Sequence, residues 1–394
     1  MGSYGQRRRG SETRSRRAQS AIHHIHDSRL RTRMPASPAP AATDDGLPAG
    51  RTATVTAVGH FLPEGCLTNA DLEGMVDTSD EWIQKRTGIR ERRILRDPEK
   101  ATSYMATRAA EELLDKRGLA AEELDAIVVG TVTPDMFYPS TACLVQDELG
   151  ATGAFGYDVS AACSGFLYAL GAGAGHVASG QCEKVLVIGA DKMSSIVDYT
   201  DRSTCILFGD GAGAVLLEPS RDGHGLRDMH QRVDGSEWEN LCQPGGGSRQ
   251  PPTHQSLDRR DHFLKQNGRP VFKQAVQRMA EASLTVMQRN DLTPEDVDYL
   301  VPHQANRRII EATAHQMGLP LEKAMMNIGE YGNTTAATLP LCLHDWETDL
   351  RKGDRLILTT FGGGYTWGAG LLTWAYDGTE GHAAGEQEEA SAGR

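Results

Sequence analysis

The chain has 394 residues, of which 39% are apolar and 43 are glycine, and this length and composition suffice for a large buried core. They exclude a disulfide-stapled miniprotein and a chain that is disordered throughout. The 53 acidic residues outnumber the 41 basic ones and give a net charge of −12, which repels nucleic-acid phosphates and anionic membrane surfaces. We therefore expect neither a nucleic acid nor a membrane among its partners.

The two ends differ in composition from the rest of the chain. Residues 1–33 contain nine arginines and only two acidic residues, and we predict a disordered basic extension over residues 1–50. An extension that precedes the true start at Met34 and an organelle transit peptide are the two alternatives for its origin. Residues 378–394 are mostly Gly, Ala and Glu, which predicts a disordered tail.

Seven cysteines are spread along the chain without a C-x-x-C pair. An odd, unpaired set argues against a disulfide framework or a zinc ribbon and favours a reducing, cytoplasmic location. No motif of His, Cys and carboxylate residues has metal-ligand spacing, so we expect neither a metal nor a resident cofactor. Residues 159–182 carry no Asp, Glu, Lys or Arg, but their small side chains favour a helix buried inside the protein over a membrane span.

Helical and strand patterns alternate in chain order. The spacing of apolar residues predicts a helix over 101–116, and short apolar runs predict buried strands at 155–159 and 214–217. The stretch 243–270 is rich in glycine, proline and charge and is expected to be a surface loop or linker. A second helix is predicted over 270–288. This alternation predicts a layered α/β fold.

An internal repeat divides the α/β region into two halves. Residues 119–128 match residues 292–301 at an offset of 173, with Leu, Glu, Asp and paired aliphatic residues at the same places. Gly180–Gly189 maps onto Gly353–Gly362 at the same offset, and both segments predict a turn followed by a buried strand. We infer a duplicated half-domain, with the halves at residues 51–225 and 226–377.

Cys163 follows the predicted strand at 155–159 and opens the uncharged helix, which places its sulfur at a helix N-terminus inside the core. The partial positive charge there favours thiolate over thiol, which is the property of a nucleophilic cysteine. An inert cysteine that fills the core is the alternative.

Three further sites lie where strands end or helices begin. His303 directly follows the strand 299–302, at the strand end where α/β proteins gather ligands and catalytic groups; a hydrogen-bonded structural histidine is the alternative. Asn333, in a Gly-Asn-Thr-Thr turn, is either a functional amide or an N-cap. Gly362–Gly364 end another strand, which indicates backbone N–H groups close to a ligand or, alternatively, a tight turn.

Four motifs follow one another along the chain: ACSGF at 162–166, VPHQAN at 301–306, YGNT at 331–334 and FGGGYTWG at 361–368. In that order they resemble the β-ketoacyl-acyl-carrier-protein synthase III family of the thiolase superfamily. SDEWIQKRTGI at 79–89 and TDR at 200–202 extend the resemblance over about residues 52–376. It implies an α/β fold of two related halves in a five-layered αβαβα arrangement, which agrees with the internal repeat.

The resemblance also implies the chemistry of each motif. Cys163 would take an acyl group from acyl-coenzyme A, a substrate and not a cofactor, as a thioester. His303 and Asn333 would promote decarboxylation of a malonyl thioester, because two neutral donors stabilise the enolate that forms. The backbone N–H groups of Cys163 and Gly363 would form the oxyanion hole. An amide cannot abstract a proton, so Asn333 favours decarboxylative condensation over thiolase-like deprotonation.

The same resemblance assigns residues to substrate binding and assembly. Trp82 and Arg202 match the pair that sandwiches the adenine ring, and Thr78 and Arg86 would lie beside the nucleotide; ordinary packing is the alternative for Trp82. Tyr138 matches an aromatic residue that closes the partner subunit's acyl pocket, which implies a homodimer. Candidates for docking an acidic carrier protein are Lys273, Arg307 and Arg308.

Three functions are compatible with these observations. The first is condensation of an acyl-coenzyme A primer with malonyl-acyl carrier protein to 3-oxoacyl-carrier protein, which initiates fatty-acid or polyketide synthesis. The second is transfer of the acyl group from Cys163 to an alcohol or amine in secondary metabolism. The third is a noncatalytic subunit that binds a carrier protein, which an intact Cys163, His303 and Asn333 set argues against.

Overall fold

The computed structural model describes residues 51–220 and 222–378. The predicted basic extension at 1–50 and the predicted tail beyond residue 378 lie outside these residues. Within the described ranges, no helix is both long enough and apolar enough to cross a bilayer. The expected cytoplasmic location stays a prediction.

Five strands form the first sheet, in the order β1–β7–β6–β4–β5. β4 lies parallel to β5 and β6, whereas β7 pairs antiparallel with both β6 and β1. All residues of β4 and β6 are buried, as expected for apolar strands covered on both faces. The bounds are β1 Thr52–Phe61, β4 Ala126–Gly130, β5 Phe155–Val159, β6 Val185–Asp191 and β7 Gly211–Ser220. Strands at 155–159 and 214–217 are therefore confirmed, but β5 is an edge strand and none of its residues is buried.

Four strands form the second sheet, in the order β11–β12–β13–β8. β11 and β12 are parallel, and β13 pairs antiparallel with β12 and with β8. The first sheet has the same sequence of parallel and antiparallel pairs from β4 to β1. The bounds are β8 Gly225–Val233, β11 Tyr299–Pro302, β12 Arg355–Gly362 and β13 Thr366–Thr373.

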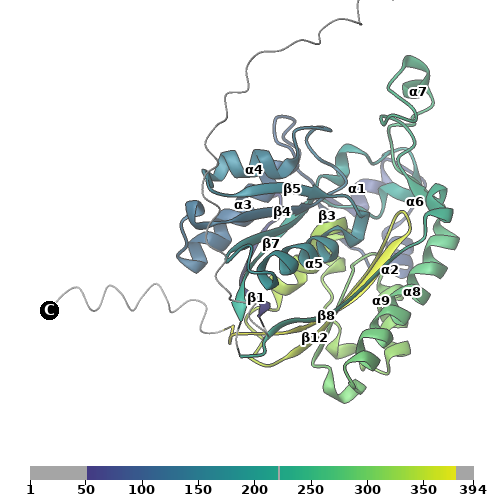
Figure 1. The fold of residues 1–394 in the computed structure, drawn as a ribbon. Coiled ribbons are helices and arrows are strands. Elements are labelled where there is room, and N and C mark those ends of the chain that lie inside the picture. The colour runs from purple at the N-terminus through teal and green to yellow at the C-terminus, as the bar shows by residue number, and fades with distance from the viewer. Residues whose placement is uncertain (1–50, 221, 379–394) are drawn as a thin grey trace, which may run out of the picture. The chain divides into compact units, whose positions relative to one another are not determined.

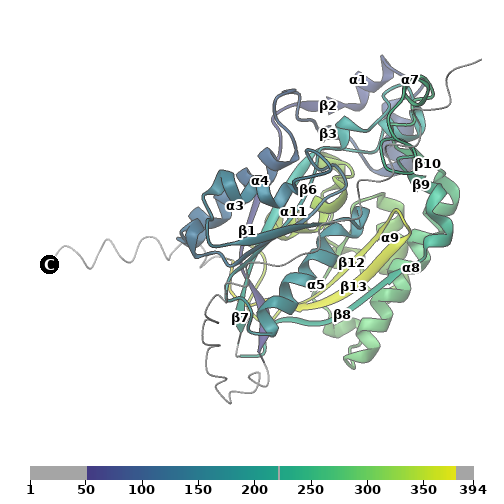
Figure 2. The same ribbon diagram turned by 45° about the horizontal axis from the view of Figure 1, so that its top comes forward.

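Helices lie outside each sheet and between the two sheets, which gives five layers (Figures 1 and 2). The apolar residues of α3 (Thr102–Arg117) and α4 (Thr141–Leu149) form one cluster with the outer face of the first sheet. α8 (Gly268–Arg289) and α9 (Arg307–Met317) cover the outer face of the second sheet in the same way. α5 (Gly165–Ala178) and α11 (Thr338–Asp345) contribute to a third cluster that joins both sheets. The fold expected from the family resemblance is confirmed, and so is the prediction of a buried helix over 159–182.

The small side chains of α5 explain how this helix fits between the sheets. A Cβ added at Gly173 would lie 2.8 Å from Cγ2 of Val187 in β6, which is closer than packed carbon atoms approach. The weakly apolar composition that argues against a membrane span therefore has a packing reason.

The internal repeat is real, but one of its two matches is displaced. Ala126 of β4 pairs with Val185, and Tyr299 of β11 pairs with Leu356. Tyr299 follows Ala126 by 173 residues, whereas Leu356 follows Val185 by 171. The match of Gly180–Gly189 with Gly353–Gly362 is therefore two residues out of register. The sequence does not reveal this error, because a shift of two residues keeps every side chain on the same face of a strand.

Shorter elements surround the layers. Two small sheets pair β2 (Cys66–Thr68) with β3 (Glu91–Arg93) and β9 (Leu241–Cys242) with β10 (Lys265–Gln266). The short helices are α1 Asn69–Glu73, α2 Asp80–Thr87, α6 Arg202–Cys205, α7 His254–Asp258 and α10 Ile328–Tyr331.

The stretch 243–270 is more ordered than the predicted surface loop, since it contains α7, β10 and the start of α8. An ion pair fixes it to the first half. Arg260 Nε and Nη2 donate to the two carboxylate oxygens of Asp198 at 2.7 and 2.6 Å.

Candidate active site

Cys163 lies in a 3₁₀ turn, Ala162–Ser164, that joins β5 to α5. The β12–β13 hairpin, which belongs to the second sheet, forms hydrogen bonds with this turn. Thr366 Oγ1 donates to Ala161 O at 2.7 Å, and Ser164 Oγ donates to Thr366 O at 3.2 Å. The first amides of such a turn have no partner inside it, so the N–H of Cys163 suits an oxyanion.

The thiol of Cys163 differs from the expectation. Burial, followed by the negative charge of Asp191, raises the pKa of the Cys163 thiol well above its usual range. The predicted preference for thiolate is therefore wrong for the free protein, because the loss of water outweighs the partial charge of a helix end. The proton must leave Cys163 as the acyl group arrives.

His303 begins the segment after β11 and is almost fully buried. Its backbone N–H donates to Thr359 O at 2.8 Å, and its Nδ1 lies 2.9 Å from Thr338 Oγ1, the first residue of α11. Thr338 Oγ1 in turn donates to Thr335 O at 3.2 Å. Burial lowers the pKa of the His303 imidazole to about 3, so the ring is neutral at physiological pH.

Asn333 is held on both its backbone and its side chain. Its N–H donates to Leu207 O at 2.9 Å, and its Oδ1 accepts from Thr335 N at 2.9 Å. This contact is an Asx-type turn and not the N-cap that the sequence offered as the alternative, because Thr334 is the residue that caps the 3₁₀ helix Thr335–Ala337. It does not exclude function, since a fixed oxygen leaves the two Nδ2 hydrogens as donors.

Cys163, His303 and Asn333 line one cavity of about 760 Å³. Gly363 lines it as well, and the neighbouring Gly362 approaches the nucleophile turn so closely that a Cβ there would lie 2.6 Å from Cys163 N. The glycine run thus passes close to the backbone of the nucleophile turn. Cys163 precedes the other three residues by 140 positions or more in the sequence, and the folding of both halves brings them together.

The residues predicted for the nucleotide gather at one side of this cavity. Trp82 and Arg86 line it, and the guanidinium carbon of Arg202 lies 5.1 Å from the centre of the Trp82 ring. Thr78 is not among the lining residues; its Oγ1 is buried and makes no hydrogen bond within the described part of the chain. A planar base would have to separate the Trp82 and Arg202 side chains to lie between them.

The three docking candidates are placed differently. Arg308 lines the cavity and covers the ring of Phe272 at 5.3 Å, and Lys273 is exposed on α8. Arg307 Nε instead donates to Glu311 at 2.7 Å. Sequence reasoning missed Arg269, an exposed cation that also lines the cavity. Its spacing of four residues from Lys273, one helical turn, was the available signal.

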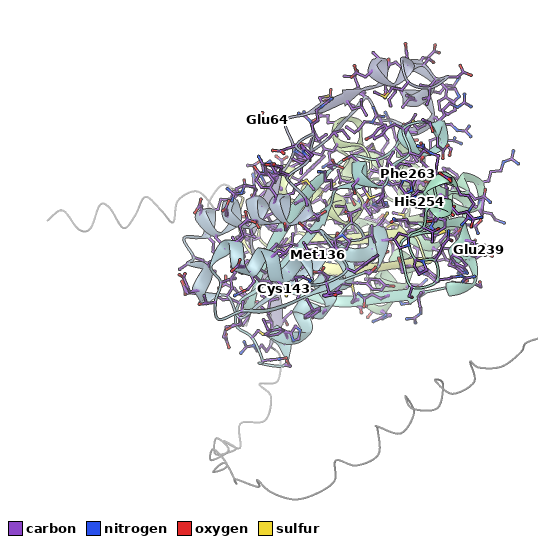
Figure 3. All side chains as sticks on the ribbon, turned by 90° about the horizontal axis from the view of Figure 1, so that it is seen from above. Glu64, Met136, Cys143, Glu239, His254 and Phe263 are labelled. Carbon is purple, nitrogen blue, oxygen red and sulfur yellow. The ribbon has the colours of Figure 1, made fainter. Side chains whose placement is uncertain are left out.

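The loop before α4 projects two aromatic side chains. Phe137 and Tyr138 are 81% and 86% exposed and do not line the cavity of this chain. Figure 3 labels Met136 of this loop and Cys143 of α4. The contribution of Tyr138 to a partner's acyl pocket stays a prediction.

Comparisons with known proteins agree with this geometry. Family models described as 3-oxoacyl-acyl-carrier-protein synthase III and its C-terminal part match residues 157–235 and 287–374. The β-ketoacyl-acyl-carrier-protein synthase III of Chlorobaculum tepidum is 56% identical over 326 residues, which cover 82% of this chain and 99% of that protein. The chain belongs to this family.

Other members of the β-ketoacyl-acyl-carrier-protein synthase III family match over the same length. That of Porphyromonas gingivalis strain ATCC 33277 is 50% identical over 327 residues, covering 83% of this chain and 98% of that protein. The crystal structure of the Aquifex aeolicus enzyme is 45% identical and superposes with a TM-score of 0.76, covering 82% of this chain and 100% of that one. Cys163 lies in the first matched segment of the family, and His303 and Asn333 lie in the second.

Proposed function

We propose that this member of the synthase III family joins the acyl group of an acyl-coenzyme A primer to the two-carbon unit of malonyl-acyl carrier protein. The products are 3-oxoacyl-carrier protein, free coenzyme A and carbon dioxide. The observation that carries the proposal is the meeting of Cys163, His303 and Asn333 on one cavity.

The first step is acyl transfer to Cys163. The sulfur attacks the thioester carbonyl, its proton passes to His303, and the coenzyme A thiolate leaves and recovers that proton. A neutral imidazole can accept a proton. Thr338 supports this role: while its hydroxyl donates to Thr335 O it accepts from Nδ1–H, which leaves Nε2 free to take the proton, and when it turns to donate to Nδ1 it supports the Nε2–H tautomer instead.

The second step is decarboxylation of the malonyl thioester. The C–C bond to the carboxylate breaks, carbon dioxide leaves, and the electron pair becomes an enolate whose oxygen needs hydrogen-bond donors. Between the two steps, proton exchange with solvent moves the hydrogen of the neutral ring from Nδ1 to Nε2. Nε2–H of His303 and Nδ2–H of Asn333 then donate to the enolate oxygen, and neither gives up its proton to it. Each donor of this kind typically lowers the barrier by ~3–4 kcal/mol.

The third step is condensation. The enolate carbon attacks the Cys163 thioester, and the N–H groups of Cys163 and Gly363 hold the oxyanion until the Cys163 thiolate is expelled. The thiolate then takes up one proton from solvent, which balances the negative charge that the malonyl carboxylate brought in. Cys163 then returns to the thiol form, which its burial favours.

Intact-protein mass spectrometry and carbon dioxide release test these steps separately. The protein is exposed to short straight, branched and aromatic acyl-coenzyme A esters, and Cys163→Ala serves as the control that stays unmodified. The adduct mass reports the accepted primer. After malonyl-carrier protein is added, Asn333→Ala should keep the acyl adduct but release carbon dioxide at least ~100-fold more slowly. Absence of carbon dioxide release with every primer would refute condensation.

Transfer to an alcohol or amine is not favoured, because that reaction forms no enolate for the Asn333 donor to stabilise. Release of coenzyme A with acceptor consumed and no decarboxylation would indicate this alternative.

Carrier-protein docking and dimerisation belong to the same proposal. Arg269, Lys273 and Arg308 lie at or beside the cavity and suit an acidic carrier. Arg308→Glu should raise KM for malonyl-carrier protein but not for acyl-coenzyme A, and the exposed Arg227→Glu on β8 is the charge-matched control. Two exposed aromatic residues, Phe137 and Tyr138, suit a subunit interface, so sedimentation equilibrium should give a dimer that Tyr138→Glu weakens.

A further inference from the structure

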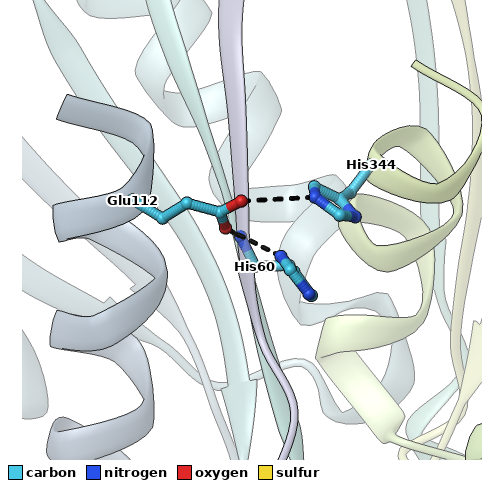
Figure 4. Close-up of side chains that lie close together, drawn as sticks. All are labelled: His60, Glu112 and His344. Atoms are coloured by element: carbon cyan, nitrogen blue, oxygen red, sulfur yellow. Dashed lines mark hydrogen bonds and ion pairs between the residues drawn. The ribbon is translucent and has the colours of Figure 1, made fainter. Parts of the chain in front are cut away.

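His60, Glu112 and His344 form a cluster of side chains far from one another in sequence (Figure 4). His60 lies on β1, Glu112 on α3 and His344 on α11. Their nitrogen and oxygen atoms all lie within 4.8 Å of one another, and none of the three side chains is fully buried. The two imidazole rings are stacked with their centres 3.6 Å apart.

The cluster opens into a cavity of its own. This cavity, about 810 Å³ in volume, shares no lining residue with the catalytic cavity. Five carboxylates line it, against the single ammonium group of Lys116. The carboxylates are Glu112, Glu330, Asp345, Glu347 and Asp349. Such an excess of negative charge favours a cation.

We propose that His60, Glu112 and His344 bind a divalent transition-metal ion such as Zn²⁺, with the remaining coordination position open to the cavity. Two imidazoles and a carboxylate are a ligand set that suits zinc, cobalt and nickel. The sequence-based expectation of no metal rested on local spacing motifs, and no such motif links these three residues because each comes from a separate element.

The distances fit an ion with small adjustments of the side chains. Glu112 Oε2 lies 2.7 Å from His60 Nδ1, and Glu112 Oε1 lies 3.4 Å from His344 Nε2. Ligands at ~2.0–2.2 Å from a tetrahedral zinc are ~3.4 Å apart. Asp345 Oδ1 lies 3.5 Å from His344 Nδ1, on the ring nitrogen that stays free when Nε2 binds the ion, which is where metal-bound histidines commonly find an oxygen.

A proton is the competing occupant of the cluster. Burial by itself would lower the pKa of His344, but its hydrogen bonds to Asp345 and Glu112 outweigh burial and raise the pKa to about 9. Lys116 Nζ, 3.7 Å from Glu112 Oε1, also opposes a metal, although it donates to Glu347 at 2.9 Å and to Val58 O at 3.0 Å. The experiment must therefore separate a metal site from a proton-bridged ion pair.

Equilibrium dialysis against Co²⁺, with the bound metal measured by mass spectrometry, makes this distinction. The full chain is used with His23, His24 and His26 replaced by Gln in every arm, because these N-terminal histidines also offer imidazoles. We expect one cobalt ion per chain, with visible bands of nitrogen and oxygen ligation and no thiolate charge-transfer band. Zn²⁺ should displace the cobalt and raise Tm.

Single variants from two elements keep the test independent of any one folding defect. His60→Gln and His344→Gln should each weaken cobalt binding at least about 100-fold, since residues that only orient a ligand cost ~10–100-fold. His254→Gln, an exposed histidine on α7 (Figure 3), is the matched control and should bind as the parent does. Circular dichroism checks that each variant is folded.

Three results would overturn the proposal. Binding that survives both variants, or a thiolate band, would place the ion at other residues. No bound metal in the parent chain would leave the cluster as a proton-bridged ion pair.

Discussion

Gly362→Ala tests whether the close approach of β12 to the nucleophile turn shapes the site. An added Cβ would lie 2.6 Å from Cys163 N, 3.1 Å from Ala162 Cβ and 3.2 Å from Ser164 N. Non-bonded atoms prefer about 3.5 Å or more, so the strand end or the turn must move by roughly 0.5–1 Å. The φ of Gly362 is not positive, so the effect is steric and not conformational.

The displacement falls on the two N–H groups proposed for the oxyanion hole. Loss of one such donor costs ~3–4 kcal/mol, a fall of ~100–1000-fold in rate. Overpacking should also lower the free energy of unfolding by ~1–3 kcal/mol. Urea denaturation measures the second quantity, and the transfer rate from acyl-loaded Cys163 measures the first.

Gly175→Ala is the matched control for this substitution. Gly175 lies in α5, the helix that follows the turn, and no heavy atom outside its own helix backbone lies within 4 Å of an added Cβ. Alanine there should stabilise the protein by ~0.5–1 kcal/mol and leave the rate unchanged. If folded Gly362→Ala condensed at the parent rate, the assignment of this backbone to the oxyanion hole would be refuted.

Three further predictions concern hydrogen bonds and pH. Thr338→Val removes the partner of His303 Nδ1 and should slow condensation ~10-fold or more without changing KM for acyl-coenzyme A, while Thr338→Ser restores the rate; equal loss in both variants would contradict this. Because the pKa of His303 is about 3, decarboxylation by acyl-loaded protein should be constant from about pH 8 to 5, and a fall centred near the ordinary imidazole value of about 6.5 would disprove a neutral ring. The Arg260 guanidinium holds the pKa of Asp198 well below its usual range, so this pair stabilises the fold above about pH 4 and the contribution is lost as the pH falls below it. Arg260→Met should accordingly lower Tm at pH 7 and less so near pH 3, with faster proteolysis of the 243–267 segment; a difference in Tm that is the same at both pH values would count against the ion pair.

The features that sequence predicted well are those set by local pattern. β5 has the predicted bounds, and the helices predicted at 101–116 and 270–288 differ from α3 and α8 by one or two residues at each end. Apolar periodicity determines such elements because each side chain's face follows from its position. The catalytic set was placed by motif order together with resemblance to a family.

The features that sequence missed depend on contacts between distant elements. No local signal links Thr338 to His303, or His60 to His344 across the fold. The preference of Cys163 for thiolate was also mispredicted, because burial in the folded protein and the charge of Asp191 raise the pKa of the thiol. The exact alignment of the two halves could not be predicted from the sequence either, because a shift of two residues preserves the alternation of side chains between the two faces of a strand.

The apolar cluster shared by α5, α11 and both sheets has a consequence for how the molecule unfolds. If the polypeptide were cut between β7 and β8, each fragment would expose to water the apolar surface that the other half covers in the intact protein. Although the two halves share one arrangement of strands, they are therefore not autonomous modules, and calorimetry should record one cooperative transition and not two.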